Sequence, residues 1–268
     1  MTDERGSLEP IFSPRSVAVI GASRRRDSIG FALVHNLLLE EFDGPIFPVN
    51  PKATSIHSLK AYPAIGDVPD PIDLAVIAVP RDAVLDVVEQ CVDKAVRGLV
   101  VITAGFSETG PEGAALEERL CDLVRGNGIR MVGPNCMGVL NTDPGVRLNA
   151  TFAPTPARAG SIGFVSQSGA LGVAILNAAQ DLGVGLTQFV SMGNKADLSA
   201  NDMAEYWEDD DRTRVICMYL ESFGNPRNFT QIAKRVGRKK PILVVKSGRT
   251  RRVLGPPPAT PAPSRAPT

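Results

Sequence analysis

Short apolar segments alternate with longer segments of helical periodicity from the beginning of the chain. Residues 16–20 form a run of mostly β-branched apolar side chains that leads directly into Gly21. Residues 29–40 then carry apolar side chains at the three- and four-residue spacing of one helical face. Because a strand that is apolar on both faces is typical of a buried parallel strand, this stretch predicts a strand, a tight turn and a helix.

The same alternation continues through the first half of the chain. We predict further strands at residues 46–49, 72–80, 98–104 and 130–132, with helices at residues 81–95 and 111–126. Strands that alternate with helices of this length indicate parallel βαβ units. The pattern therefore predicts an α/β fold with a doubly wound parallel sheet.

A second series of elements follows a stretch with little periodicity. Residues 141–160 contain three prolines, and we expect a linker with one short strand there. Strands are then predicted at residues 160–165, 185–191, 215–220 and 241–245, with helices at residues 170–181, 200–208 and 229–237. This restart predicts a second α/β domain.

Two turns between a strand and a helix consist of small residues. The first is Gly21-Ala22-Ser23, and Ser28 follows it as an N-cap for the helix. The second is Ser166-Gln167-Ser168-Gly169. A strand, a small-residue turn and a helix N-terminus together present backbone N–H groups to a phosphate. Since ligands bind parallel sheets at the carboxyl ends of the strands, we expect a site at this edge.

The end of the second predicted strand disfavours one class of ligand. Dinucleotide-binding domains place an acidic residue there to hold a ribose hydroxyl, whereas this chain has Asn50, Pro51 and Lys52. The first turn also lacks the complete G-x-G-x-x-G spacing. A lysine at this position suits a phosphate better than a ribose diol, so the sequence argues against NAD.

The composition and charge of the chain argue against several further classes of function. The chain is 43% hydrophobic with a net charge of zero and no basic block, which argues against a nucleic-acid partner. No apolar run is long enough to span a membrane, and the first residues contain no apolar signal segment, so we expect a cytoplasmic protein. Four cysteines without close pairing predict reduced thiols and no metal site.

Nine stretches in order resemble one known family. The chain is similar to the CoA-binding α portion of the ADP-forming acyl-CoA synthetases (acetate–CoA ligase, NDP-forming), which are relatives of the succinyl-CoA synthetase α subunit. The matching stretches are SVAVIGAS…IG (16–30), PVNPK (48–52), AVIAVP (75–80), ITAGFSE (102–108), GPNCMG (133–138), FVSQSGALG (164–172), SMGNKADLS (191–199), MYLES (218–222) and VVKSGRT (244–250).

The resemblance implies a domain organisation and a set of site residues. It implies a Rossmann-like CoA-binding domain at residues 8–145 and a flavodoxin-like, succinyl-CoA synthetase-like domain at residues 157–250. It implies that CoA binds through Gly21, Ala22, Ser23, Lys52, Val79, Pro80 and Asn135. It implies that a phosphoryl group is received at Ser166, Gln167, Ser168 and Gly169, and that Glu221 orients a phosphorylated histidine.

The family's reaction joins an acid to CoA with ATP and forms acyl-CoA, ADP and phosphate through that phosphohistidine. The resemblance therefore implies CoA as a cofactor, with ATP or ADP and Mg held only by an ATP-grasp β subunit or domain. A homo-oligomer is also compatible with it. The acid itself is not indicated by these residues.

The chain departs from the family where the phosphorylated histidine belongs. The family carries it in an S-H-T-G-like motif after K-S-G-R-T, but here Thr250 is followed by residues 251–268, a Pro- and Ala-rich tail that we expect to be disordered. The only histidines are His35 and His57. We expect a truncated or frame-shifted gene product with an incomplete second domain.

Three functions therefore remain open. The first is a synthetase component that is inactive alone because its carrier histidine is missing. The second is a non-catalytic CoA-binding module with a role in regulation or assembly. The third, which the end of the second strand disfavours, is an NAD(P)-binding protein.

Overall fold

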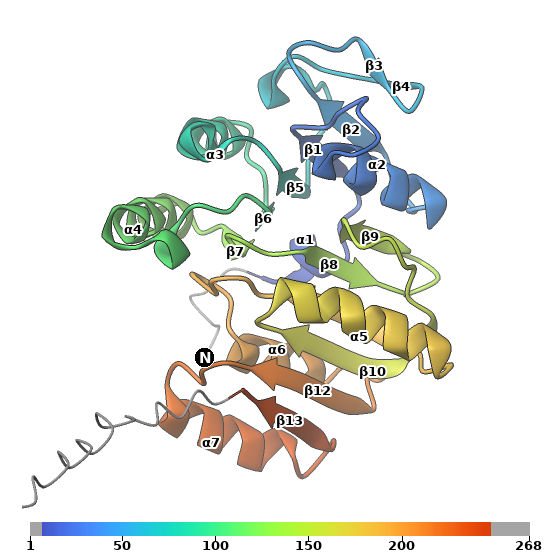
Figure 1. Ribbon diagram of the computed structural model, residues 1–268, viewed down its shortest axis with the longest axis vertical. Helices are drawn as coiled ribbons and strands as arrows, with labels where there is room; N and C mark the ends of the chain where they lie inside the picture. The colour runs from blue at the N-terminus through green and yellow to red at the C-terminus, as the bar shows by residue number, and fades with distance from the viewer. Residues whose placement is uncertain (1–6, 248–268) are drawn as a thin grey trace, which may run out of the picture.

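The first of two large sheets is entirely parallel. A computed structural model describes residues 7–247 and contains these two sheets in the upper and lower parts of Figure 1. The first sheet has the order β2-β1-β5-β6-β7. Its strands are β1 (Val17–Ile20), β2 (Ile46–Val49), β5 (Leu74–Ile77), β6 (Gly98–Val101) and β7 (Arg130–Val132). Every residue of β1, β5, β6 and β7 is buried, and the predicted doubly wound parallel sheet is confirmed.

Helices cover both faces of this sheet. They are α1 (Glu9–Phe12), α2 (Ile29–Leu39), α3 (Val84–Asp93) and α4 (Pro111–Gly126). Alternate residues of β1 divide between two cores: Val17 and Val19 pack with α2, whereas Ala18 and Ile20 pack with α3 and α4. The short strands β3 (Ser55–Ile56) and β4 (Leu59–Lys60) form an antiparallel hairpin that the apolar pattern did not predict.

The second sheet is mixed, with the order β13-β12-β10-β11-β8-β9. Its strands are β8 (Gly138–Asn141), β9 (Leu148–Thr151), β10 (Ala159–Ser166), β11 (Leu186–Ser191), β12 (Val215–Leu220) and β13 (Ile242–Lys246). Its helices are α5 (Gly169–Asp181), α6 (Ala200–Glu208) and α7 (Pro226–Val236). The core around Phe189 holds α5, and the core around Trp207 on the other face holds α6 and α7.

The one short strand expected within residues 141–160 is β9, whereas β8, which begins at Gly138, was not predicted. Strands β8 and β9 pair with each other, and β8 adds antiparallel to β11. The buried polar residue Asn141 explains why the apolar pattern missed β8. Asn141 Nδ2 donates to the carbonyl of Phe12 at 2.8 Å, and Asn36 Nδ2 donates to the carbonyl of Thr151 at 2.7 Å. Amides satisfied in this way are compatible with a buried strand.

A buried ion-pair cluster joins the two halves of the chain. Arg130 Nε donates to Asp197 Oδ2 and its Nη2 donates to Asp202 Oδ1, each at 3.0 Å. The three side chains are at most 9% exposed. Burial by itself raises the pKa of Asp202, but the hydrogen bonds from Ser199 and Arg130 outweigh this effect and lower that pKa. Arg130 and Asp202 are therefore both charged at neutral pH.

The predicted disorder of residues 251–268, like the end of the K-S-G-R-T stretch, lies outside the described residues. Within residues 7–247, no helix combines the length and the apolar character that crossing a membrane requires.

We predict that Arg130→Met lowers the free energy of unfolding by about 3–5 kcal/mol, because it leaves two buried carboxylates without their main counter-charge. Urea denaturation followed by circular dichroism measures this change. Arg25→Met is the control, since Arg25 pairs with Asp27 at the surface, with side chains 76% and 82% exposed. The control should have little effect. Equal stabilities of the two variants would contradict a structural role for the cluster.

Candidate functional site

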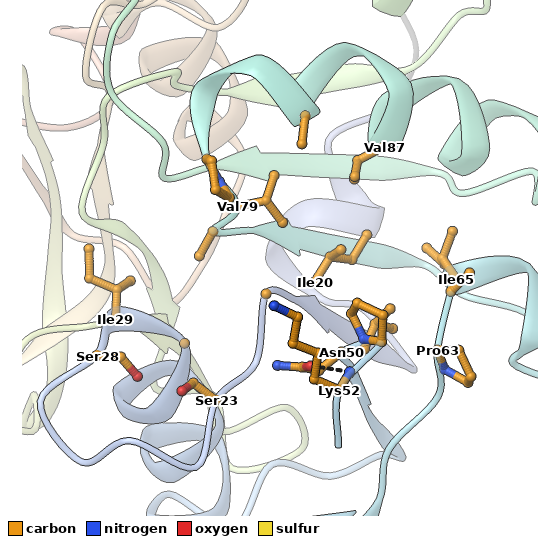
Figure 2. A pocket seen from close by; sticks show the side chains of 18 of the residues that line it. Ile20, Ser23, Ser28, Ile29, Asn50, Lys52, Pro63, Ile65, Val79 and Val87 are labelled. Atoms are coloured by element: carbon orange, nitrogen blue, oxygen red, sulfur yellow. Dashed lines mark hydrogen bonds between the residues drawn. The ribbon is translucent and has the colours of Figure 1, made fainter. Parts of the chain in front are cut away.

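The first cavity lies at the carboxyl ends of β1, β2 and β5 and has a volume of about 800 Å³. Figure 2 shows Ser23, Ser28 and Lys52 on one side of it, and Val79 and Val87 on the other. The polar side is formed by the turn after β1, the first turn of α2 and the end of β2. The cavity therefore offers hydrogen-bond donors and a cation opposite an apolar wall.

Two glycines allow the turn after β1 to lie close to its neighbours. Gly21 has a φ of +90°, and a Cβ there would lie 2.2 Å from the carbonyl oxygen of Ala78, which directly follows the neighbouring strand β5. A Cβ on Gly30 would lie 2.0 Å from the carbonyl oxygen of Gly21. Ser28 caps α2 as predicted, accepting from the amide of Phe31 at 3.3 Å. The N-terminus of α2 is thus held directly against the turn.

The side chain of Asn50 fixes the polar side of this cavity. Its Nδ2 donates to the carbonyl of Ala22, and its Oδ1 accepts from the amide of Lys52, both at 2.7 Å. Both polar atoms of this side-chain amide therefore form hydrogen bonds within the protein. A dinucleotide-binding domain would offer a carboxylate to a ribose at this position. This arrangement gives a structural reason to disfavour NAD.

The first cavity fits a nucleotide that carries phosphates. The first N–H groups of a helix have no acceptor inside it, and the helix dipole favours an anion at that end. The side chain of Lys52 also lines the cavity and adds positive charge, whereas Arg25 pairs there with Asp27. Ile65, Val79 and Val87 line it with apolar surface, as suits a base or an alkyl chain.

The second cavity lies between the two halves of the chain and also has a volume of about 800 Å³. It is bounded by the N-terminus of α5 and by the loops that follow β7, β11 and β12. Ser168 caps α5, with its hydroxyl oxygen 3.4 Å from the amide nitrogen of Leu171. The described residues that line it are Ser107, Glu108, Asn135, Cys136, Met137, Phe152, Gln167, Ser168, Gly169, Ala170, Val173, Gly193, Asn194, Lys195, Glu221 and Ser222.

The backbone after β12 is held by side chains from two other segments. Gln167 Oε1 accepts from the amides of Glu221 and Ser222 at 2.8 and 3.0 Å, and its Nε2 donates to the carbonyl of Ser222 at 2.8 Å. Lys195 Nζ donates to the same carbonyl at 3.0 Å and to the Ser222 hydroxyl. Burial lowers the pKa of Lys195, although the charge of Glu221 acts in the opposite direction.

An amide bridge crosses the rim of the second cavity. Asn194 Nδ2 donates to Glu108 Oε2 at 2.6 Å and to Glu117 Oε2 at 2.7 Å, while Asn194 Oδ1 accepts from Asn135 Nδ2 at 3.2 Å. Burial raises the pKa of Glu108, but the hydrogen bonds from Asn194 and from the Gly105 amide outweigh it and lower that pKa. This carboxylate is therefore ionised beside the cavity.

The predicted site residues divide between the two cavities. Gly21, Ser23, Lys52, Val79 and Pro80 line the first one. Asn135 lines the second one instead, together with Gln167, Ser168, Gly169 and Glu221.

Two predicted residues do not face a cavity. Ala22 is buried, and Ser166 is buried with its hydroxyl donating to the carbonyl of Ser168 at 2.8 Å. Both therefore support the turns to which they belong.

Sequence reasoning assigned no role to Glu108, Asn194 or Lys195. They lie within the stretches ITAGFSE and SMGNKADLS, but their position on separate loops gave no signal that they meet. His35 and His57 lie near each other, with ring centroids 5.7 Å apart, and neither lines the second cavity. Burial raises the pKa of Cys136 to about 12, so its thiol stays protonated. Within residues 7–247, no cluster of three or more metal-ligating side chains occurs.

Comparison with known proteins identifies both halves of the chain. Residues 15–142 match the model of the CoA binding domain, and residues 159–254 match that of the succinyl-CoA ligase like flavodoxin domain.

Two curated relatives are ADP-forming acetate–CoA ligases. The chain is 43% identical to the I subunit alpha from Pyrococcus furiosus, over 92% of this chain and 54% of that protein. It is 44% identical to the ligase from Methanocaldococcus jannaschii, over 91% of this chain and 34% of that protein. The chain thus spans about half or less of the length of these relatives.

A solved structure is similar over most of the chain. It is the dinucleotide-forming acetyl-coenzyme A synthetase 1 of Ca. Korarchaeum cryptofilum in complex with phosphate and ADP. The match has a TM-score of 0.87 and 44% identity, and it covers 91% of this chain and 52% of that one.

We predict that Gly30→Ala lowers the free energy of unfolding by about 1–3 kcal/mol, because the new methyl group would collide with the carbonyl of Gly21. Urea denaturation measures the change. Gly126→Ala is the matched helical control, since a Cβ there meets nothing within 4 Å. It should be neutral or stabilising by up to about 1 kcal/mol. A Gly30→Ala protein as stable as the Gly126→Ala protein would contradict the close packing of the turn.

Proposed function

We propose that this chain, which joins a CoA binding domain to a succinyl-CoA ligase like flavodoxin domain, is the CoA-binding part of an ADP-forming acyl-CoA synthetase. The complete enzyme would convert an acid, CoA and ATP into acyl-CoA, ADP and phosphate. The observation that carries the proposal is the first cavity, because its Lys52 and its helix N-terminus lie within the residues that match the CoA binding domain.

Lys52 and the N-terminus of α2 would hold the phosphates of CoA in the first cavity. A charge-assisted hydrogen bond from an ammonium to a phosphate is among the stronger contacts in proteins. The wall formed by Ile65, Val79 and Val87 would cover apolar parts of the same ligand. CoA carries phosphates and needs no carboxylate to read a ribose 2′-hydroxyl, which agrees with the engaged side chain of Asn50.

The second cavity would receive a phosphoryl group at the N-terminus of α5. Ser168 and Gly169 lie at that N-terminus, and the helix dipole favours an anion there. Glu221 lines the same cavity and would orient the ring of a phosphorylated histidine by accepting its N–H. Gln167 supports both roles, because its side chain ties the turn before α5 to the backbone at Glu221.

A partner would supply the nucleotide chemistry. The relative from Pyrococcus furiosus is an α subunit, and the similar synthetase from Ca. Korarchaeum cryptofilum was solved with phosphate and ADP. We infer an ATP-grasp β subunit or domain that holds ATP or ADP with Mg, in the cytoplasm. When bound, that nucleotide would be the source of the phosphoryl group.

A second candidate function follows from the histidines. The family carrier belongs after Thr250, whereas the sequence contains only His35 and His57. A chain without that carrier would bind CoA without relaying phosphate, as a regulatory or assembly module. The two candidates differ in whether phosphorylation can be restored in the presence of a partner.

Lys52→Ala should weaken CoA binding by about 1.5–3 kcal/mol, because it removes a charge-assisted contact to phosphate. We expect a smaller loss for dephospho-CoA if Lys52 contacts the 3′-phosphate. Isothermal calorimetry with CoA, dephospho-CoA and NAD measures these affinities, and NAD should bind much more weakly than CoA. Lys234→Ala, an exposed lysine of α7, is the control and should change none of them. Tighter binding of NAD than of CoA would refute the proposal.

The chain with its present sequence should form no phosphohistidine when ATP and an ATP-grasp β subunit are added. Replacing the residues after Thr250 by a family-like continuation with S-H-T-G should restore phosphorylation, and Glu221→Gln should then reduce it. Incorporation of ³²P that is stable to base and labile to acid is the measurement. Such label at His35 or His57 of the unchanged chain would contradict this account, and failure of the restored chain would favour the non-catalytic module.

A further inference from the structure

We propose that a third cavity, beside the turn between β8 and β9, binds a small apolar α-amino acid, with Glu40 holding its ammonium group and Arg147 its carboxylate. This cavity has a volume of about 340 Å³. Its described lining residues include none that line the first or the second cavity. The site is therefore separate from those proposed for CoA and for a phosphoryl group.

The third cavity is formed by segments that are far apart in the chain. Glu40 directly follows α2, Arg147 directly precedes β9, and Ala159 begins β10. Strand β9 lies at the edge of the second sheet, next to α2 (Figure 1). The cavity is at the turn of the β8–β9 hairpin, whereas Met137 and Phe152, which line the second cavity, are at the opposite end of that hairpin.

Glu40 offers a half-buried carboxylate at the negative end of a helix. It is the C-cap residue of α2, whose last turn contains no basic residue. Burial raises the pKa of Glu40, and the effect that opposes burial is a hydrogen bond from Asn149 and not a nearby cation. The dipole of α2 also favours a positive group at this end of the helix. An ammonium group on a ligand would give this carboxylate a counter-charge.

The guanidinium group of Arg147 is held in place by two backbone carbonyls. Its Nε donates to the carbonyl of Glu41 at 2.7 Å, and its Nη1 donates to the carbonyl of Pro144 at 2.9 Å. Its Nη2 lies 3.9 Å from Asp43 Oδ1, but the two side chains are 40% and 62% exposed, and such a surface pair is weak. The remaining N–H groups of Nη1 and Nη2 can therefore donate to a ligand carboxylate in the forked geometry that arginine favours.

The apolar part of the lining suits the side chain of the ligand. It consists of Leu140, Pro144, Leu148, Ala157 and Ala159. A volume of about 340 Å³ is at the small end of the range for ligand sites, which favours a ligand of few heavy atoms. An apolar side chain that covers this surface gains free energy by leaving water.

The polar side chains of the lining already form hydrogen bonds within the protein. Thr142 Oγ1 donates to the carbonyl of Leu186 at 2.7 Å, and Asn141 Nδ2 donates to the carbonyl of Phe12 at 2.8 Å. Asn149 donates to the carboxyl group described above. A hydroxyl group on the ligand side chain would find these groups engaged, so we expect an apolar amino acid to be preferred over a polar one of the same shape.

Isothermal calorimetry with the full chain tests the site with L-valine, L-threonine, isovaleric acid and isobutylamine. We expect L-valine to bind with a Kd of about 1 mM or tighter. Isovaleric acid lacks the ammonium group and isobutylamine lacks the carboxylate, so each should bind about tenfold more weakly or worse. L-Threonine has the shape of L-valine but carries a hydroxyl group, and it should bind several-fold more weakly.

Two variants assign the binding to the charged groups. Glu40→Gln should weaken L-valine binding about tenfold or more, because it removes the counter-charge of the ammonium group. Arg147→Lys keeps the positive charge but loses the forked geometry, and it should weaken binding several-fold. Glu41→Gln is the matched control, since Glu41 is exposed and its side chain does not line the cavity. It should leave the affinity unchanged, and circular dichroism verifies that each variant is folded.

The outcomes separate this inference from the proposed function. A chain that binds CoA but not millimolar L-valine overturns the amino-acid site and leaves the proposed function intact. Equal affinities for L-valine and its two analogues also overturn the site, as does an unchanged affinity in folded Glu40→Gln. A chain that binds L-valine with the expected preferences but does not bind CoA supports the site and overturns the proposed function alone.

Discussion

The buried ion pairs of Arg130 hold the two halves of the chain in one arrangement. Arg130 lies on the last strand of the first sheet, and its partners Asp197 and Asp202 lie before and within α6 of the second half. Charges this deeply buried are tolerated only when their geometry is satisfied, so the cluster strongly disfavours other arrangements. It also sets the loop after β11 against the loop after β7: a Cβ on Gly193 would lie 2.2 Å from the carbonyl oxygen of Pro134. The second cavity is formed between these two loops and the N-terminus of α5.

Two cavities with different chemistry follow from this arrangement. The first is built within one sheet and presents Lys52 and a helix N-terminus opposite an apolar wall. The second is built across two sheets and presents another helix N-terminus, the side chains of Glu108 and Glu221, and a lysine, Lys195, that is hydrogen-bonded to Ser222. Thr103 joins them through its hydroxyl and its carbonyl. A ligand with phosphates at one end and a reactive group at the other can occupy both, which is the physical basis for proposing a thioester chemistry.

Departures from the expected structure have a common cause. Strand β8 was not recognised because its buried positions include Asn141, and an apolar pattern has no signal for a polar residue that finds a partner after folding. The partners of Asn36 and Asn141 are carbonyls more than a hundred residues away in the chain. Asn135 was expected in the first cavity but lines the second one. The amide bridge through Asn194 that positions it depends on the approach of two separate loops.

The sequence by itself determined the parallel strands, the two small-residue turns and the helix caps, because each depends on neighbours within a few residues. Ser28 and Ser199 are the N-cap residues of α2 and α6, as their position before a periodic segment predicts: Ser28 Oγ accepts from the amide of Phe31, and the amide of Ser199 donates to Asp202. The sequence also determined that a lysine and not an acid follows the second strand. Only the tertiary structure decided which residues meet, such as Lys195 with Ser222 and Glu108 with Asn194. These contacts join segments whose separation carries no periodic signal, so packing alone fixes them.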